Sequence, residues 1–273
     1  YHMKTVVVGA VISGCVCAYE LSKAGHEVVV VEKGRGVGGR MATRRMQGAR
    51  IDHGAQFLTA RSPRMLTLLE QWKASQTVVS WYDRIPNRPD LPTGVRYRGS
   101  MGMTSPVKYL ARSFSSELVF FVDQVVRHDA GWLVCEAGTQ GRQLTADHVV
   151  LTLPSVQMLD LFDRSSLVLD DGTMERLRGI RHTRCLALLG LLEDQSSLDH
   201  PGTVTHPDEQ VDWLSDNQRK GISELPSFTL HANDEYSQKY WDASDEERVP
   251  HLLGVAEEFL GARVTQWSVH RWG

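Results

Sequence analysis

The chain has 273 residues and a formal net charge of −3 at pH 7, so it is long enough for one or two domains with a large core. Hydrophobic residues make up 41% and charged residues 23% of it, the ordinary balance of a globular protein. The weakly acidic charge excludes the basic surface expected of a nucleic-acid-binding protein. No apolar run reaches the roughly 18 residues of a membrane helix. We therefore expect neither nucleic acid nor a membrane as a partner.

The first residues have the strand–turn–helix–strand order of a nucleotide-binding βαβ unit. Thr5–Val8 and Val28–Val31 are β-branched runs, which is typical of buried parallel strands. Between them, Cys15–Ala24 predicts a helix that ends at Gly25. Two such strands joined by a helix predict an α/β fold with a parallel sheet.

The turn after the first strand is close to the dinucleotide-binding fingerprint G-x-G-x-x-G, with valine at the second glycine position. The first glycine of this fingerprint permits the tight turn, and the third lets the helix pack close to the strand. The second lets the backbone approach the pyrophosphate, so a β-branched residue there is expected to crowd the phosphates. The turn residues that we predict to bind the cofactor are Gly9, Val11, Ile12, Ser13 and Gly14.

Glu32 stands at the end of the second predicted strand, 18 residues after Gly14. An acidic residue about 20 residues after the fingerprint accepts a hydrogen bond from a ribose hydroxyl. A carboxylate there would repel a 2′-phosphate, which favours FAD or NAD over NADP. A βαβ unit without a nucleotide is the alternative interpretation.

A glycine-rich segment, Gly34–Met41, follows directly. Glycines bring backbone N–H groups near an anion, and Arg40 can add a charge-assisted contact to phosphate. Arg44 and Arg45 add positive charge close by. A flexible loop on a solvated basic surface is the alternative. The residues assigned to the cofactor here are Lys33, Gly39, Arg40 and Met41.

These motifs together resemble those of a known family. Glu32-Lys33 followed by Gly-x-Gly-Gly-Arg40 resembles the flavin amine oxidase superfamily. The resemblance narrows to the renalase-like branch in the continuation Met41–Arg45 and in Ile51-Asp-His-Gly-Ala-Gln-Phe-Leu-Thr-Ala-Arg61. Two later segments are similar to the same family, Ala146–Pro154 and Trp267–Trp272.

This resemblance implies a p-hydroxybenzoate hydroxylase-like architecture that is α/β (α+β overall). A Rossmann-like domain would bind FAD without a covalent bond, and a second domain built on a β-sheet would bind the substrate. The expected bounds are 3–61, 100–155 and 267–273 for the discontinuous FAD-binding domain. The substrate domain would take 62–99 and 156–266.

The resemblance also implies an activity. Renalase-type enzymes oxidise dihydronicotinamide isomers of NAD(P)H by hydride transfer to the flavin, and oxygen reoxidises the flavin. A flavin amine oxidase is an alternative, and a non-catalytic relative with impaired FAD binding is another because of Val11. Members of the family usually continue past Trp272 with a tail that contacts the flavin, whereas this chain stops at Gly273. We expect that tail to be missing.

In the family, the block after Asp52 faces the flavin, which assigns His53, Gly54, Ala55, Gln56 and Phe57 to the cofactor. His53 and Gln56 are our candidates for catalytic residues on the wall that faces the substrate. The alternative is a segment that packs under the cofactor, with His53 serving only backbone groups. The family also implies that Val125 lies near the adenine.

Four residues are candidates for substrate contact. Trp213 can stack on a ring and Lys220 can meet a phosphate, with Asn217 between them in a turn that we expect to be exposed. Arg271 can approach the flavin or a substrate phosphate. A solvated loop and an interdomain structural role are the alternatives. The substrate would be a small molecule, either a nicotinamide nucleotide or an amine, with oxygen as the second reactant.

The four cysteines have no metal-binding spacing, so we expect no metal site: they are Cys15, Cys17, Cys135 and Cys185. Buried reduced thiols in a cytoplasmic protein are the preferred interpretation.

Overall fold

The computed structural model describes residues 2–85, 87–90, 93–129 and 131–273. The chain forms two compact units. Unit 1 comprises residues 1–39 and 107–181, and unit 2 comprises residues 40–106 and 182–273. Each unit is discontinuous in sequence, and each has its own sheet and core.

The division into compact units differs from the predicted division by function. Residues 40–61, 100–106 and 267–273 lie in unit 2, and residues 156–181 lie in unit 1. Compactness does not define where a cofactor binds, so the functional division stays a prediction.

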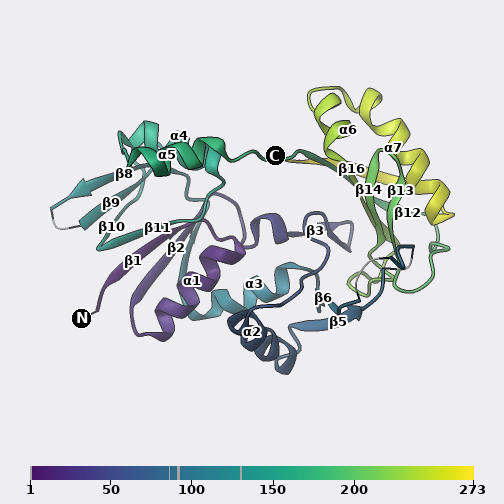
Figure 1. Cartoon of the computed structure of the whole chain (residues 1–273), viewed down its shortest axis with the longest axis horizontal. Coiled ribbons are helices and arrows are strands. Elements are labelled where there is room, and N and C mark those ends of the chain that lie inside the picture. Colours follow the sequence, from purple (N-terminus) through teal and green to yellow (C-terminus); the bar gives the residue numbers. More distant parts are fainter. Residues whose placement is uncertain (1, 86, 91–92, 130) are drawn as a thin grey trace. The chain divides into compact units, whose positions relative to one another are not determined.

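Unit 1 contains a four-stranded parallel sheet in the order β11-β1-β2-β7 (Figure 1). Its strands are β1 (Lys4–Val8), β2 (Glu27–Glu32), β7 (Ser115–Leu118) and β11 (His148–Leu151). Valines fill the two central strands because parallel strands are covered on both faces. The predicted α/β fold with a Rossmann-type parallel sheet is confirmed.

Helix α1 (Ile12–Lys23) connects β1 to β2 and begins three residues earlier than the sequence suggested. Its side toward the sheet carries the small buried residues Gly14, Cys15 and Ala18. A Cβ atom on Gly14 would lie 2.2 Å from the Gly9 carbonyl oxygen, so only glycine allows this approach. Gly9 itself has a φ of +104°, a conformation that L side chains rarely adopt.

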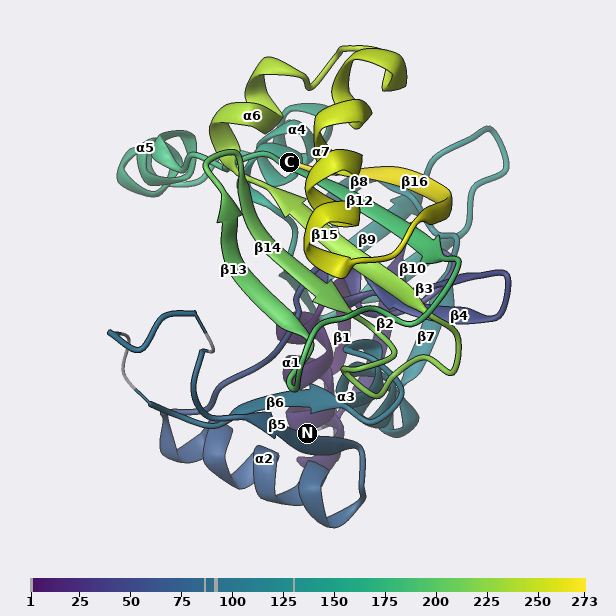
Figure 2. The same cartoon turned by 90° about the vertical axis from the view of Figure 1, so that its right-hand side faces the viewer.

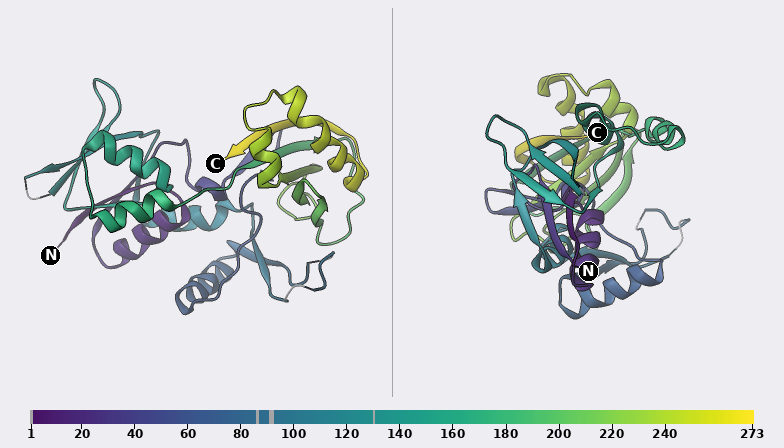
Figure 3. Two further views of the ribbon diagram at one scale, coloured as in Figure 1. Left: turned by 45° about the horizontal axis from the view of Figure 1, so that its top comes forward. Right: turned by 90° about the vertical axis from the view of Figure 1, so that its left-hand side faces the viewer.

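Unit 1 also contains a three-stranded antiparallel sheet and two helices. The strands are β8 (Val122–His128), β9 (Gly131–Glu136) and β10 (Gln143–Ala146), and the helices are α4 (Ser155–Ser165) and α5 (Asp171–Gly179). Helices α4 and α5 lie next to one another, as Figure 3 shows. Helix α3 (Thr104–Leu110) and the 3-10 helix η2 (Ala111–Ser113) carry the chain from unit 2 into unit 1.

Unit 2 is built on a five-stranded antiparallel sheet in the order β13-β14-β15-β12-β16 (Figure 2). Its strands are β12 (Cys185–Leu192), β13 (Thr203–Asp208), β14 (Val211–Asp216), β15 (Ser227–Ala232) and β16 (Val264–Trp272). Helices α6 (Asp234–Lys239) and α7 (Asp245–Leu260) cover one face. Leu188, Leu214 and Leu230 of the sheet pack there against Leu252 and Leu260 of α7.

The other face of this sheet receives the N-terminal part of unit 2. Its elements are η1 (Gly39–Met41), β3 (Thr43–Met46), β4 (Ala49–Asp52), α2 (Pro63–Ala74), β5 (Val78–Tyr82) and β6 (Arg96–Gly99). Ile51 of β4 packs against Ala187 and Leu189 of β12. Strand β4 thus places residues 52–57, a segment that begins at the last residue of the strand, at this face of the sheet.

The segment that contains Trp213, Asn217 and Lys220 is not the exposed turn that we expected. Trp213 lies in β14, and Asn217 and Lys220 follow it with exposed fractions of 0% and 1%. The turn is buried because residues 52–57 cover it, and those residues are distant in sequence.

Within the part of the chain that the structure describes, no helix is both long and apolar enough to cross a membrane.

Candidate functional site

The predicted phosphate-binding turn of unit 1 leaves the N-terminus of α1 open. Val11 is the N-cap residue, and no side chain that the structure describes caps the helix or places an acidic group in its first turn. The first N–H groups of a helix have no partner within the helix and carry a partial positive charge. This end of α1 therefore offers donors to an anion. Ser13 is exposed there, and its predicted contact with the cofactor stays a prediction.

Glu32 joins the turn to the glycine-rich segment. One carboxylate oxygen accepts a hydrogen bond from the Ala10 N–H, and the other accepts one from the Gly34 N–H, each at 2.8 Å. A carboxylate oxygen has two lone pairs, so each oxygen keeps one acceptor position for a ribose hydroxyl. The placement of Glu32 is thus compatible with the predicted role.

Val11 packs against the glycine-rich segment. A Cβ atom added to Gly39 would lie 2.5 Å from Cγ1 of Val11, and Gly38 donates its N–H to the Ala10 carbonyl at 2.9 Å. The valine side chain thus fills space that Gly39 leaves by having no side chain. The fingerprint pattern could not show this contact, because it depends on where the second glycine segment folds.

The remaining residues predicted for the cofactor have varied surroundings. Lys33 is exposed and donates to Gln157 at 3.1 Å. Val125 is 2% exposed and packs in the core of unit 1, so its predicted contact with an adenine stays a prediction. In unit 2, Arg40 is exposed, and its carbonyl accepts the N–H of Ala55 at 2.8 Å.

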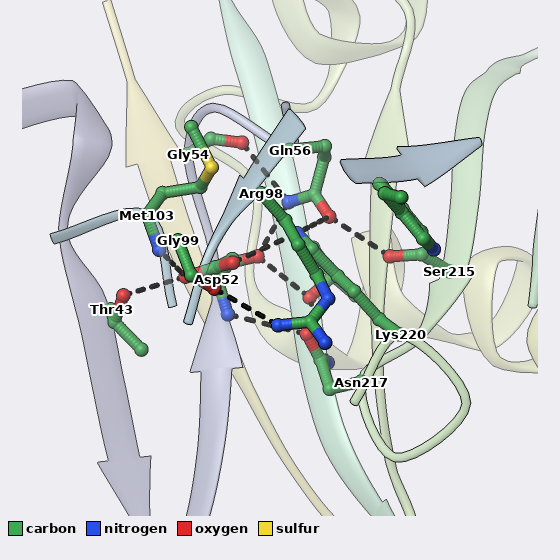
Figure 4. A network of polar contacts seen from close by, with 12 residues as sticks. Thr43, Asp52, Gly54, Gln56, Arg98, Gly99, Met103, Ser215, Asn217 and Lys220 are labelled. Atoms are coloured by element: carbon green, nitrogen blue, oxygen red, sulfur yellow. Dashed lines mark hydrogen bonds and ion pairs between the residues drawn. The ribbon is translucent and has the colours of Figure 1, made fainter. Parts of the chain in front are cut away.

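Unit 2 contains a buried ion pair between Asp52 and Lys220, whose Nζ lies 2.8 Å from Oδ2 of Asp52 (Figure 4). Neither side chain is exposed to solvent. Burial lowers the pKa of the Lys220 ammonium, and the Asp52 carboxylate acts in the opposite direction. Charges removed from water require such pairing, since an isolated buried charge is very unfavourable.

Asp52 has hydrogen bonds on both its side chain and its backbone. Its Oδ1 accepts from the Thr43 hydroxyl at 2.6 Å and from the Met103 N–H at 2.8 Å. Its own N–H donates to Asn217 Oδ1 at 3.3 Å, and its carbonyl accepts from the Thr229 hydroxyl at 2.8 Å. The start of segment 52–57 is therefore fixed from several elements of unit 2.

The Gln56 side chain is fully occupied by the protein. Its oxygen accepts from the Ser215 hydroxyl at 3.0 Å and from Lys220 at 3.3 Å. Its nitrogen donates to the carbonyls of Asp52 and Gly54 at 2.5 and 3.1 Å. An amide side chain has two acceptor and two donor positions, and all four are used. The catalytic role of Gln56 stays a prediction, and this conformation leaves it no group for a substrate.

Two predicted substrate residues, Asn217 and Lys220, also bond within this network. Asn217 bonds to Asp52 and also donates to Thr229 at 3.2 Å, and Lys220 bonds to Asp52 and Gln56. The sequence analysis did not select Asp52, Ser215 and Thr229 of this network. Each is a polar residue that is buried in a strand, at 0% exposure, and the sequence pattern does not show this burial.

His53 differs from these residues because one nitrogen of its ring has no hydrogen-bond partner among the described residues. Its carbonyl accepts from Trp272 Nε1 at 2.8 Å and lies 3.0 Å from His231 Nε2. Its ring meets His270 edge-on, with 4.8 Å between centroids, and its Nδ1 has no hydrogen-bond partner among the described residues. Burial, followed by His270 and Arg44, lowers the pKa of His53 to about 4, so the ring is neutral at pH 7.

Arg271 does not join the other predicted substrate residues. It is paired with Leu186 across β16 and β12, and Leu186 belongs to the core under α7. Its guanidinium donates to the Trp241 carbonyl at 3.2 Å. Neighbouring residues of a strand point to opposite faces, so His270 and Trp272 lie on the His53 side and Arg271 does not. Its predicted contact with a flavin or phosphate stays a prediction.

All four cysteines are free thiols. Among the described residues, no group of three or more histidine, cysteine or acidic side chains is arranged to hold a metal ion.

Comparisons with known proteins agree with the fold. Residues 7–72 match the family model of the NAD(P)-binding Rossmann-like domain. A protein of Mycobacterium tuberculosis named as a flavin-containing monoamine oxidase, AofH, is 35% identical over 100 residues, which are 37% of this chain and 20% of that protein. The match thus spans about a fifth of this curated relative's length.

Solved structures are similar over nearly the whole chain. One is described as a protoporphyrinogen oxidase from Exiguobacterium sp. 255-15, with a TM-score of 0.72 and 15% identity over 99% of this chain and 86% of that one. Another is wild-type putrescine oxidase bound to putrescine, with a TM-score of 0.67 and 16% identity over 98% of this chain and 84% of that one. At these identities the similarity shows the fold alone.

We expect Lys220→Met to lower the free energy of unfolding by about 3–5 kcal/mol, because it leaves the Asp52 carboxylate buried without its partner. In Asp52→Asn with Lys220→Met, no charge is left unpaired, so the double variant should be more stable than Lys220→Met alone. Urea denaturation followed by circular dichroism measures both. Lys73→Met, in the exposed pair with Glu70, is the control and should show no measurable loss. A Lys220→Met variant as stable as this control would contradict the prediction.

Proposed function

We propose that this chain is a renalase-like, FAD-dependent oxidoreductase that oxidises dihydronicotinamide isomers of NAD(P)H. The observation that carries the proposal is the βαβ turn of unit 1. The uncapped end of α1 offers N–H donors to a pyrophosphate, and Glu32 keeps acceptor positions for a ribose. The resemblance of the sequence motifs and the matched relative, which is named for its flavin, support FAD as the cofactor.

The residues that would hold the cofactor are compatible with it in unit 1. Gly9 and Gly14 keep the turn and the helix close to the sheet, and the exposed Ser13 stands at the open end of α1. Val11 lies against Gly39 and does not cap α1, but it adds a β-branched side chain where the fingerprint has a glycine. We therefore expect binding that is weakened and not abolished.

When bound, FAD would accept a hydride from the dihydronicotinamide ring and pass two electrons to oxygen, which gives NAD(P)+ and hydrogen peroxide. The protein would supply position and exclude side reactions. In unit 2 the Asp52–Lys220 pair fixes segment 52–57, and His53 keeps a free ring nitrogen on it. A neutral imidazole with a free nitrogen can orient a ligand by a hydrogen bond without adding charge.

A flavin amine oxidase is the second candidate, and the name of the matched relative favours it. An amine oxidase requires a site that binds a cationic amine. A non-catalytic relative is the third, and the valine at the second glycine position of the fingerprint favours it.

The proposal is tested by adding FAD to the purified chain, dialysing it and recording the absorbance spectrum. Retained bands near about 370 and 450 nm, as oxidised flavin shows in such proteins, are the expected result. Anaerobic mixing with a dihydronicotinamide isomer should then bleach the bands, whereas benzylamine and putrescine should not. Bleaching by the amines alone would establish the second candidate. A folded, colourless protein would overturn the proposal.

We expect Val11→Gly to raise the affinity for FAD by roughly tenfold, because relief of overpacking of this kind is worth one to a few kcal/mol. Val11→Ala keeps only the Cβ atom and should give an intermediate affinity. Flavin fluorescence quenching on titration measures all three proteins. Unchanged or weaker binding by Val11→Gly would show that the valine does not obstruct the pyrophosphate.

A further inference from the structure

Three buried polar atoms without hydrogen-bond partners lie in one aromatic cluster of unit 2. They are the Tyr82 hydroxyl, Trp213 Nε1 and Arg96 Nε, and none of them has a partner among the described residues. Tyr82 and Trp213 are only 7% and 8% exposed. Buried polar groups are nearly always paired, so three exceptions in one place indicate a missing partner.

The three side chains that carry these atoms share Phe57 as a neighbour. The Phe57 ring lies 5.8 Å from the Trp213 ring and 6.5 Å from the Tyr82 ring, measured between centroids. The Arg96 guanidinium carbon lies 5.6 Å from the Phe57 ring and 5.3 Å from the Tyr82 ring. Trp81 completes this aromatic cluster and lies 4.8 Å from Tyr82.

A pocket of about 550 Å³ adjoins the aromatic cluster. Trp81 and Tyr82 belong to both, and Val95 and Pro201 add apolar surface to the pocket. The three unpaired atoms are themselves covered by their neighbours. A ligand therefore reaches them from the pocket only when a ring of the cluster moves aside.

The chemistry of the aromatic cluster selects the kind of ligand. Trp213 Nε1 and Arg96 Nε are donors only, and the Tyr82 hydroxyl can donate as well. The Arg96 guanidinium lies over the Phe57 and Tyr82 rings, and Lys220 Nζ, whose charge is paired with Asp52, lies 4.8 Å from the Trp81 ring. On the pocket wall, Asp83 is exposed beside Arg84 and His200. The donors and the Arg96 charge favour acceptor oxygens and disfavour a protonated amine.

We propose that Tyr82, Trp213 and Arg96 bind the acceptor oxygen of a planar ring that carries a carboxylate or carboxamide group. This inference deepens the proposed function, on which it rests for one step, namely that the ring is the nicotinamide of the substrate. The aromatic side chains supply stacking surface, and the three donors bind the oxygen of the ring substituent. The Arg96 charge disfavours a cationic amine at this subsite.

Three near-isosteric probes test the subsite by isothermal titration calorimetry at pH 7. They are nicotinate, nicotinamide and 3-(aminomethyl)pyridine, which carry an anionic, a neutral and a cationic group on the same ring. We expect nicotinate to bind most tightly, nicotinamide less tightly and the amine not at all. Tyr82→Phe and Trp213→Phe each remove one donor and keep a ring, so each should weaken nicotinate binding roughly three- to tenfold.

Matched controls lie in unit 2, on the face of the sheet that α6 and α7 cover. Tyr240→Phe and Trp241→Phe make the same changes at residues packed with α7 and should leave nicotinate binding unchanged. Thermal unfolding distinguishes a ligand-binding role from a structural one. Removing a polar group that has no partner should not lower the melting temperature, so Tyr82→Phe should melt at or above the wild-type temperature.

Tightest binding of the amine, or nicotinate binding unchanged in both Tyr82→Phe and Trp213→Phe, would overturn the subsite. A lower melting temperature for Tyr82→Phe with unchanged nicotinate affinity would assign the hydroxyl a structural role instead. The probes need no flavin, so the two proposals fail separately. Nicotinate binding in a colourless protein would overturn only the proposed function, and a yellow protein that binds no nicotinate would overturn only the subsite.

Discussion

The buried ion pair between Asp52 and Lys220 is the interaction on which the arrangement of unit 2 depends. It connects the end of β4 to the turn after β14, two segments that are far apart in the sequence. A buried pair of this kind adds little net stability compared with apolar residues of the same size, but it penalises every arrangement that separates its charges. The pair therefore specifies where segment 52–57 lies more than how strongly unit 2 folds.

This constraint separates positioning residues from residues with free groups. Gln56 and Asn217 use their amide groups within the network around Asp52. His53 and Trp213 each keep a ring nitrogen that has no hydrogen-bond partner among the described residues. Side chains that are hydrogen-bonded within the network hold the backbone in place, and polar atoms without a hydrogen-bond partner remain for a ligand. The candidate functional residues in unit 2 can thus be ranked by whether their polar side-chain atoms already have hydrogen-bond partners.

The sequence predicted unit 1 better than unit 2 because its signals are local. The valine-rich strands, Gly9, Gly14 and Glu32 all belong to one βαβ unit of about thirty residues, for which spacing rules exist. The partner of Asp52 is Lys220, more than 160 residues away, and no spacing rule connects them. For the same reason the turn around Lys220, read as an exposed surface, is a buried one. The contact of Val11 with Gly39 was also missed, since a glycine pattern does not show which residue fills the space.

Hydrogen–deuterium exchange of the peptides that cover residues 49–58 tests most directly whether the network fixes segment 52–57. If it does, these amides exchange only through global unfolding, and their protection falls by the same free energy as that of β12 and β15 when urea is added. Exchange of the segment at low urea, while β12 and β15 stay protected, would contradict the account. It would show that residues 52–57 open locally and that the Asp52–Lys220 pair does not hold them.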